Sequence, residues 1–317
     1  MQGEGIVIKS TGSWYAVSTE DGIYQCRIRG KLRLKGIKST NPVAVGDRVW
    51  LESQEGEVKQ GNITKLLERK NYIIRKSVNL AKQTQIIAAN IDQAILIATL
   101  DFPKTTLRFI DRFAISAEAY DIPFILVFNK IDLYGEEQAD ELEFLKVVYN
   151  QAGYTVLESS ATKGIGIDAL KELMAGKTTL LSGHSGVGKS SLVNALDPSL
   201  DLKTKAISVA HNQGQHTTTF AEMHPLPFGG YIIDTPGIRG FGLVDMEPSE
   251  IGDYFPEIFA LKGGCKFHNC LHQHEPGCVV KKAVEENKLA FTRYESYLNF
   301  IEGDNDEEHF RKDIYAN

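Results

Sequence analysis

The stretch GHSGVGKS, from Gly183 to Ser190, constrains the fold of this chain more than any other feature. It matches the pattern G-x-x-x-x-G-K-[ST], in which backbone N–H groups and the start of a helix surround phosphate oxygens. An apolar run, TTLLSG, ends at the first residue of the loop, and a helical pattern, KSSLVNAL, begins at its last two residues. A buried strand, a glycine-rich loop and a helix in this order predict the phosphate-binding loop of an α/β sheet.

Each residue type in this loop has an expected task. Lys189 reaches the β- and γ-phosphates, and Ser190 is a ligand of Mg²⁺. The later stretch IIDTPG adds Asp234, which holds Mg²⁺ through water, and Gly237, whose N–H contacts the γ-phosphate. The residues expected to contact the phosphates from the loop and the first helical turn are Gly183, His184, Ser185, Gly186, Val187, Gly188, Lys189, Ser190 and Ser191.

The stretch FNKID predicts which base accompanies the phosphates. The carboxylate of Asp132 can accept hydrogen bonds from N1–H and from the exocyclic amine of guanine, whereas adenine presents neither donor there. Asn129 can bond the edge of the base, and the alkyl stem of Lys130 can cover the ring. The stretch SSAT adds Ser160 and Ala161, whose backbone can contact the guanine carbonyl. The expected substrate is therefore GTP.

These segments occur in an unusual order. In ordinary GTPases the phosphate loop precedes the base-reading motif, but here Asn129 to Asp132 comes before Gly183 to Ser190. In a parallel sheet, the position of each strand places the loop that follows it, so the chain can be cut and rejoined elsewhere without moving the site. The order predicts a circularly permuted GTPase domain of alternating strands and helices, which we assign to residues 71–245.

Residues 1–70 have a different pattern. Short strand-like runs, among them EGIVIKS, SWYAVST and DRVWLE, are separated by turn residues, which favours a small β-barrel with the five-stranded OB-fold. This part carries 12 Lys and Arg against 8 Asp and Glu, for a net charge of +4, whereas the whole chain has −6. Arg27, Arg29 and Arg33 lie in a stretch without acids. A basic barrel on an acidic protein predicts contact with a polyanion such as RNA, the alternative being a solvated charged face.

Residues 246–317 contain the stretch CKFHNCLHQHEPGC. Cys265, Cys270 and Cys278 can supply three thiolates, and a histidine can complete the tetrahedral set that is typical of structural Zn²⁺. On spacing alone, His268, His272 and His274 are all candidates. The run that follows, residues 279–301, predicts one helix, so we expect a helical zinc-binding domain. The fourth cysteine, Cys26, is distant from this cluster, and four cysteines in such a chain do not indicate disulfides.

An OB-like start, a permuted GTPase core and a C-x4-C-x-H-x5-C segment together resemble the RsgA/YjeQ family, the small-ribosomal-subunit-dependent GTPases of bacteria. The resemblance covers nearly the whole chain and favours His272 as the fourth zinc ligand. It implies late maturation of the small (30S) ribosomal subunit, binding to its rRNA, and GTP hydrolysis stimulated by the subunit. Because the sequence has no apolar run of membrane-spanning length and no signal peptide at its start, we expect a cytoplasmic protein, and we expect it to be monomeric.

Turnover is expected to depend on the loop HNQGQHTTTF. The position after DTPG, where small GTPases carry the water-orienting Gln, is occupied by Ile238, so unaided hydrolysis should be slow. His216 resembles the proposed water-positioning residue of the family, and Thr218, or its neighbour Thr217 or Thr219, can sense Mg²⁺ and the γ-phosphate. Two other functions stay open on sequence: an RNA-binding module whose nucleotide only stabilises the fold, and a permuted GTPase that acts on another RNA or ribosomal particle.

Overall fold

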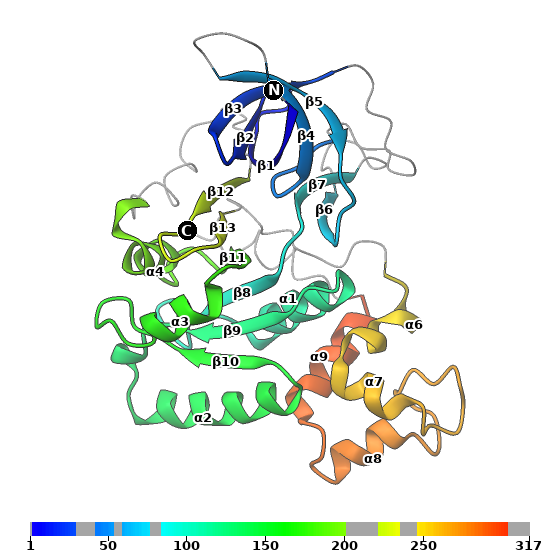
Figure 1. Cartoon of the computed structure of the whole chain (residues 1–317). Coiled ribbons are helices and arrows are strands. Elements are labelled where there is room, and N and C mark those ends of the chain that lie inside the picture. The colour runs from blue at the N-terminus through cyan, green and yellow to red at the C-terminus, as the bar shows by residue number, and fades with distance from the viewer. Residues whose placement is uncertain are drawn as a thin grey trace, which may run out of the picture.

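A computed structural model describes residues 2–29, 42–53, 59–76, 84–200, 221–234 and 246–303 of the 317-residue chain (Figure 1). A β-barrel at the N-terminus, a central α/β unit and a C-terminal group of helices follow one another along the chain. This is the multidomain fold class predicted from the sequence. The domain boundaries 1–70, 71–245 and 246–317 stay predictions.

The barrel is built from five strands whose order around the closed sheet is β1-β2-β3-β5-β4, with β4 pairing back to β1. The strands are β1 (Gln2–Ser10), β2 (Tyr15–Thr19), β3 (Gly22–Ile28), β4 (Arg48–Ser53) and β5 (Gln60–Leu66). Pairing is antiparallel except between β3 and β5. Alternate side chains point inward because the side-chain period of a strand is two. The buried interior comprises Val7, Tyr15, Val17, Cys26, Val43, Val49, Leu51 and Ile63.

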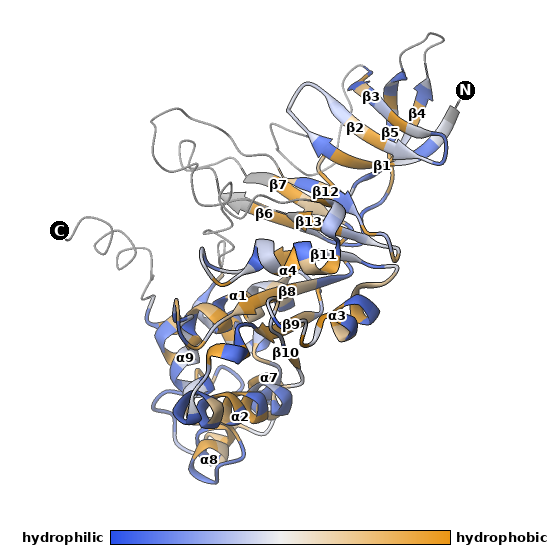
Figure 2. Cartoon of the chain, turned by 90° about the vertical axis from the view of Figure 1, so that its left-hand side faces the viewer, coloured by the Kyte–Doolittle hydropathy of each residue, from blue (hydrophilic) through white to orange (hydrophobic). Residues whose placement is uncertain are grey.

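The barrel is joined to the rest of the molecule in two ways. Strand β1 continues into the central sheet through an antiparallel pairing with β12 (Glu222–Pro225), at Lys9 and Glu222. A separate antiparallel pair, β6 (Tyr72–Lys76) and β7 (Thr84–Ala89), lies beside the barrel and bridges to Val45. Figure 2 shows that the barrel and the central unit form one elongated body.

The central sheet has the strand order β10-β9-β8-β11-β13-β12. All neighbours are parallel except β12, which is antiparallel to β13. The parallel strands are β8 (Gln93–Ala98), β9 (Phe124–Phe128), β10 (Thr155–Glu158), β11 (Thr178–Ser182) and β13 (Tyr231–Asp234). The phosphate-loop strand β11 lies between the base-motif strands on one side and β13 on the other. The chain forms β8, β9 and β10, which include the base-motif strands, before it reaches β11. This is the permuted order predicted from the sequence.

Helices cover both faces of this sheet (Figure 1). One core cluster joins α1 (Leu107–Ala119) and α2 (Glu136–Gln151) to side chains such as Leu96 and Leu126, and the other joins α3 (Ile167–Met174) and α4 (Lys189–Leu196) to Ile95, Ile97 and Val127. Successive residues of β8 thus point to opposite faces, and every residue of β8 and β9 is buried. Buried parallel strands are continuous apolar runs for this reason.

The C-terminal unit contains α6 (Pro248–Ile251), α7 (Pro256–Lys262), α8 (Val279–Glu285) and α9 (Phe291–Ile301). The single helix predicted for residues 279–301 is wrong, because the chain breaks between α8 and α9. Asn287 has a φ of 56°, and the N–H groups of Asn287 and Lys288 donate to the carbonyls of Val284 and Ala283. This is a Schellman termination with Asn in the left-handed position. None of the helices in the described part of the chain is long and apolar enough to cross a bilayer.

Candidate nucleotide and zinc sites

The phosphate-binding loop joins the carboxyl end of β11 to α4, and two of its glycines are required by close approaches. Gly183 has a φ of 149°, and a Cβ there would lie 2.5 Å from the carbonyl oxygen of Ile97. Gly188 has a φ of 93°, and a Cβ there would lie 2.5 Å from Nδ2 of Asn129. Any larger residue at Gly188 would push the base-reading turn away from the loop.

Asn129 links the base-reading turn to the phosphate loop. Its side chain is buried, its Nδ2 donates to the carbonyl of Val187 at 2.8 Å, and its Oδ1 accepts from the Ser159 hydroxyl at 3.1 Å. Lys130 follows with a φ of 63°. The structure therefore brings together Asn129, Lys130 and the loop Gly183 to Ser190, which are more than 50 residues apart in sequence, at one edge of the sheet. This edge is where parallel α/β sheets bind ligands.

The carboxylate of Asp132 is exposed and held by two hydroxyls. Ser160 donates to Oδ1 at 2.5 Å and Thr162 donates to Oδ2 at 3.2 Å. The Ser160 hydroxyl is the first cause of a pKa of Asp132 below its ordinary value, because a hydrogen bond to the carboxylate favours the charged form. An ionised, oriented acceptor is what two donors of guanine require.

The structure describes some of the residues expected around the β- and γ-phosphates. Nζ of Lys189 donates to the carbonyls of Gly183 and His184, at 2.5 and 2.9 Å, so the ammonium lies over the loop. Ser190 is buried in the first turn of α4. The backbone of Asp234 ends β13 opposite Leu181 of β11. His216, Thr218, Gly237 and Ile238 lie outside the described residues.

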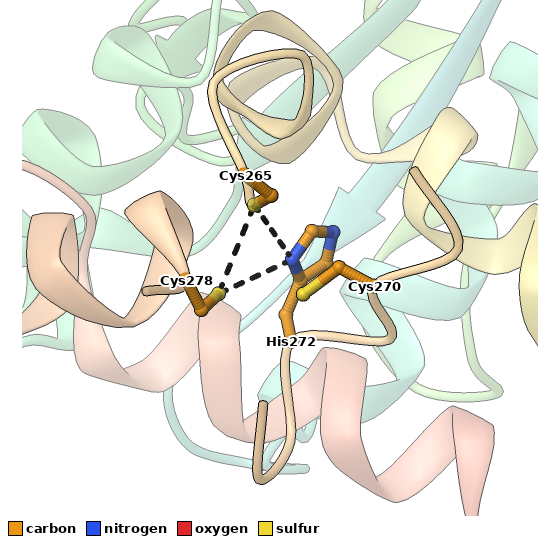
Figure 3. Close-up of side chains that lie close together, drawn as sticks. All are labelled: Cys265, Cys270, His272 and Cys278. Atoms are coloured by element: carbon orange, nitrogen blue, oxygen red, sulfur yellow. Dashed lines mark hydrogen bonds between the residues drawn. The ribbon is translucent and has the colours of Figure 1, made fainter. Parts of the chain in front are cut away.

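The C-terminal unit brings Cys265, Cys270, His272 and Cys278 together, with all four ligand atoms within 4.8 Å of one another (Figure 3). Sγ of Cys265 lies 3.9 Å from Sγ of Cys278, and Nδ1 of His272 lies 3.6 and 3.4 Å from these two sulfurs. A tetrahedral zinc ion with ordinary bond lengths requires edges of about 3.8 Å between sulfurs and about 3.5 Å between sulfur and nitrogen. The cluster therefore fits a structural Zn²⁺. His268 and His274 are not part of it.

The surroundings of the cluster favour a bound cation. Burial raises the pKa of the Cys270 thiol to about 12 and lowers the pKa of His272, so thiolates at this site need a positive ion to stay charged. Helix α9 fixes the ligand loop, because the hydroxyls of Tyr294 and Tyr297 donate to the carbonyls of His272 and Leu271. These are backbone supports that keep the imidazole in place.

Two family models match the chain. The one described as RsgA GTPase matches residues 66–244, and the one described as RsgA N-terminal domain matches residues 4–63. The chain belongs to the RsgA GTPase family. Among curated relatives, the RsgA of Christiangramia forsetii is 58% identical over 98% of this chain and 99% of its own length, and that of Flavobacterium johnsoniae is 58% identical over 98% and 96%. Both are described as small ribosomal subunit biogenesis GTPases.

Solved structures agree with this family assignment. YjeQ from Thermotoga maritima superposes with a TM-score of 0.78 at 35% identity, covering 96% of this chain and 98% of that one. YloQ, described as a circularly permuted GTPase, superposes with a TM-score of 0.74 at 31% identity, covering 96% and 95%. The permuted RsgA strand order seen here is therefore shared with experimentally determined relatives.

Sequence motifs did not reveal three residues of this site. Ser159 and Thr162 flank Ser160 and orient Asn129 and Asp132, although the motif assigns only backbone contacts to this stretch. Tyr134, two residues beyond Asp132, bonds the backbone of the base-reading turn. The hydroxyl groups in SSAT were a usable signal, since hydroxyls beside a carboxylate commonly orient it. Tyr134 carried no such signal, because one of its two partners, Leu100, belongs to a loop 34 residues earlier in the chain.

Proposed function

We propose that this protein hydrolyses GTP to GDP and phosphate and acts as a late maturation factor of the small (30S) ribosomal subunit. The main support for GTP hydrolysis is the hydrogen bond between Asn129 and Val187, which joins a guanine-reading turn to a phosphate loop. A nucleotide that spans both must carry a guanine base and a phosphate chain. The names of the curated relatives support the ribosomal half.

The chemistry divides among residues of the site. Asp132, Asn129 and Lys130 bind the base, with the backbone of Ser160 and Ala161 on its carbonyl. Lys189 and the loop N–H groups neutralise phosphate charge, and Ser190 and Asp234 hold Mg²⁺, which supplies further charge neutralisation. Gly237 and Thr218 sense the γ-phosphate. His216 orients the attacking water, a task that Gln performs in small GTPases at the position occupied here by Ile238. Basal turnover is slow because this water-orienting loop needs the subunit to complete it.

Ribosomal RNA is the proposed ligand of the barrel. On its outer face the guanidinium of Arg27 lies 4.0 Å from the centre of the Trp14 ring, and a hollow of about 270 Å³ is lined by Trp14, Gln25, Arg27, Gln60, Gly61 and Asn62. Arg29 is paired with Glu52 at 2.6 Å, whereas Arg27 has no carboxylate partner among the described residues. Unpaired cations and stackable rings on this face of an OB-fold are typical of single-stranded nucleic-acid binding. Arg33 lies outside the described residues.

Zinc has a structural role in this proposal, because the Cys265, Cys270, His272 and Cys278 set has no open position for a substrate. The protein is monomeric and cytoplasmic, and no membrane is among its partners. GTP and GDP, the small subunit and its rRNA are its ligands.

The deciding experiment measures GTP hydrolysis with no ribosomal particle, with purified small subunits and with purified large subunits. We expect stimulation by small subunits alone. Binding of GTP without turnover under all three conditions would make the nucleotide a structural ligand. Equal stimulation by large subunits would contradict the small-subunit assignment.

The contribution of the barrel can be tested with two nearby arginines, Arg27 on β3 and Arg29 just beyond its end. Arg27→Ala should weaken subunit binding and lower its salt dependence by about one phosphate contact, because a cation leaves the interface. Arg29→Ala is the matched control and should have a smaller effect, because Glu52 already neutralises Arg29. Subunit affinity measured at two salt concentrations checks both variants. A larger loss for Arg29→Ala would contradict the placement of the RNA on the Trp14–Arg27 face.

A further inference from the structure

The loop between β8 and α1, residues 99–105, lies against the nucleotide site although none of the nucleotide-binding motifs includes it. Its two ends are tied together, because the Thr105 N–H donates to the carbonyl of Thr99 at 2.8 Å and the Thr99 N–H donates to the Thr105 hydroxyl at 3.1 Å. Both threonines are buried. We name residues 99–105 the β8–α1 loop. Hydrogen bonds that close a short loop restrict the positions available to its tip.

The tip of the β8–α1 loop contacts both halves of the nucleotide site. The carbonyl of Phe102 accepts from Nζ of Lys130 at 2.6 Å, which sets the direction of the lysine stem expected to cover the base. On the phosphate side, a Cβ at Gly186 would lie 3.2 Å from Cδ of Pro103. The β8–α1 loop therefore lies against both the base-reading turn and the phosphate loop.

Tyr134 joins the β8–α1 loop to the base-reading turn by hydrogen bonds. Its hydroxyl accepts from the Leu100 N–H at 3.0 Å and donates to the carbonyl of Asn129 at 2.9 Å. Leu100 and Asn129 are buried, with exposed fractions of 4% and 1%, so water cannot replace this hydroxyl without rearrangement. A buried N–H or C=O that loses its partner costs about 1–3 kcal/mol, and the backbone of both segments would move to avoid that cost.

We propose that Tyr134 is a positioning residue for guanine recognition, holding the β8–α1 loop against the turn Asn129 to Asp132 so that the base pocket is formed before nucleotide binds. The inference rests on the proposed GTPase function. Because only the fraction of molecules with a formed pocket binds tightly, loss of this hydroxyl should raise the dissociation constants of GDP and GTP by the same factor.

The test compares Tyr134→Phe with Tyr149→Phe. The control removes a hydroxyl that is more deeply buried than that of Tyr134 and donates from α2 to Asp111 of α1 at 2.8 Å. We expect Tyr134→Phe to raise Kd for GDP and GTP by about tenfold, with kcat at saturating GTP unchanged, whereas Tyr149→Phe leaves both Kd values as in the wild type. ITP lacks the exocyclic amine but needs the same formed pocket, so its Kd should rise by the same factor in Tyr134→Phe and the preference for GTP over ITP should stay as in the wild type.

Wild-type protein provides an independent measurement. The Leu100 amide should be protected from hydrogen exchange in the nucleotide-free state, because the Tyr134 hydroxyl already accepts from it. Wild-type affinity in Tyr134→Phe, an equal loss in Tyr149→Phe, or an unprotected Leu100 amide would overturn the inference. A wild type that binds GTP no better than ITP would instead contradict the proposed function.

Discussion

Arg293 joins the zinc-binding helices to the GTPase domain, and its replacement by Met should separate them. The Arg293 side chain on α9 is 2% exposed. Its Nη1 donates to Asp111 of α1 at 2.5 Å, and its Nε donates to Glu257 of α7 at 2.6 Å. Tyr149 of α2 also donates to Asp111, at 2.8 Å. One guanidinium therefore neutralises two carboxylates from two domains.

The unfolding free energy that Arg293→Met is expected to lose can be divided between the two carboxylates. Asp111 is 1% exposed and, among the described residues, would keep the Tyr149 hydroxyl as its one donor, which we expect to cost about 3 kcal/mol. Glu257 is 14% exposed and can turn toward water, which we expect to cost about 1 kcal/mol. The total of about 4 kcal/mol lies within the ~3–5 kcal/mol typical of breaking a buried pair from one side. Methionine retains the length of the stem, so lost packing adds little.

The assay is urea denaturation of zinc-loaded protein, followed by release of zinc to a coloured chelator. With a slope of about 1–2 kcal/mol per molar urea for a unit of this size, zinc release in Arg293→Met should shift down by roughly 2–4 M. Lys288→Met is the matched control, since Lys288 pairs with Glu286 at 2.6 Å in the same unit but is 72% exposed. Its shift should correspond to less than about 1 kcal/mol. Equal shifts in the two variants would refute the reasoning.

Three further predictions concern single residues. Asp132→Asn should weaken GTP binding by about tenfold or more, because the amide accepts from only one guanine donor and presents its own NH₂ to the other; titration with GTP and ITP checks this. His216→Ala should lower kcat by an order of magnitude or more with little change in Kd for GTP, and a comparable loss of affinity would indicate a structural role. Burial raises the pKa of the Cys26 thiol from 9.0 to about 11, so its protonated form stabilises the fold at lower pH. That contribution should decline between pH 9 and pH 11, where only the unfolded chain ionises, and Cys26→Ala should flatten the unfolding free energy over this range.

The sequence was most informative where function requires a fixed residue type at a fixed spacing. The loop Gly183 to Ser190, the turn Asn129 to Asp132 and the three cysteines of the zinc cluster each have a local signature, whereas the choice of His272 came from the family resemblance. The permuted sheet followed from their order, because a parallel sheet places each loop by its strand. Continuous apolar runs indicated the strands of the central sheet that are buried on both faces.

Features that depend on contacts between distant segments were not predictable in the same way. Strand β12 is the four-residue segment EMHP, which contains no β-branched or aromatic residue, and it is a strand because β13 and β1 lie on either side of it. The partners Arg293 and Asp111 are 182 residues apart. The break between α8 and α9 depends on Asn287, whose left-handed conformation is common for Asn but is not required by it. A helical pattern with one Asn in it predicts either one helix or two.

The permutation places the two segments proposed to sense the γ-phosphate next to the barrel, which is proposed to bind rRNA, and next to the zinc-binding unit. Residues 201–220, which contain His216 and Thr218, lead into β12, and β12 pairs with β1 of the barrel through Lys9 and Glu222. The DTPG segment leaves β13, and the chain then continues to the zinc-binding unit at residue 246. One of these segments is therefore followed in the chain by a strand paired with the barrel, and the other by the zinc-binding unit. If a change of nucleotide state alters how the barrel or the zinc-binding unit binds the small subunit, then by linkage the bound subunit must change the affinity for that nucleotide state by the same factor.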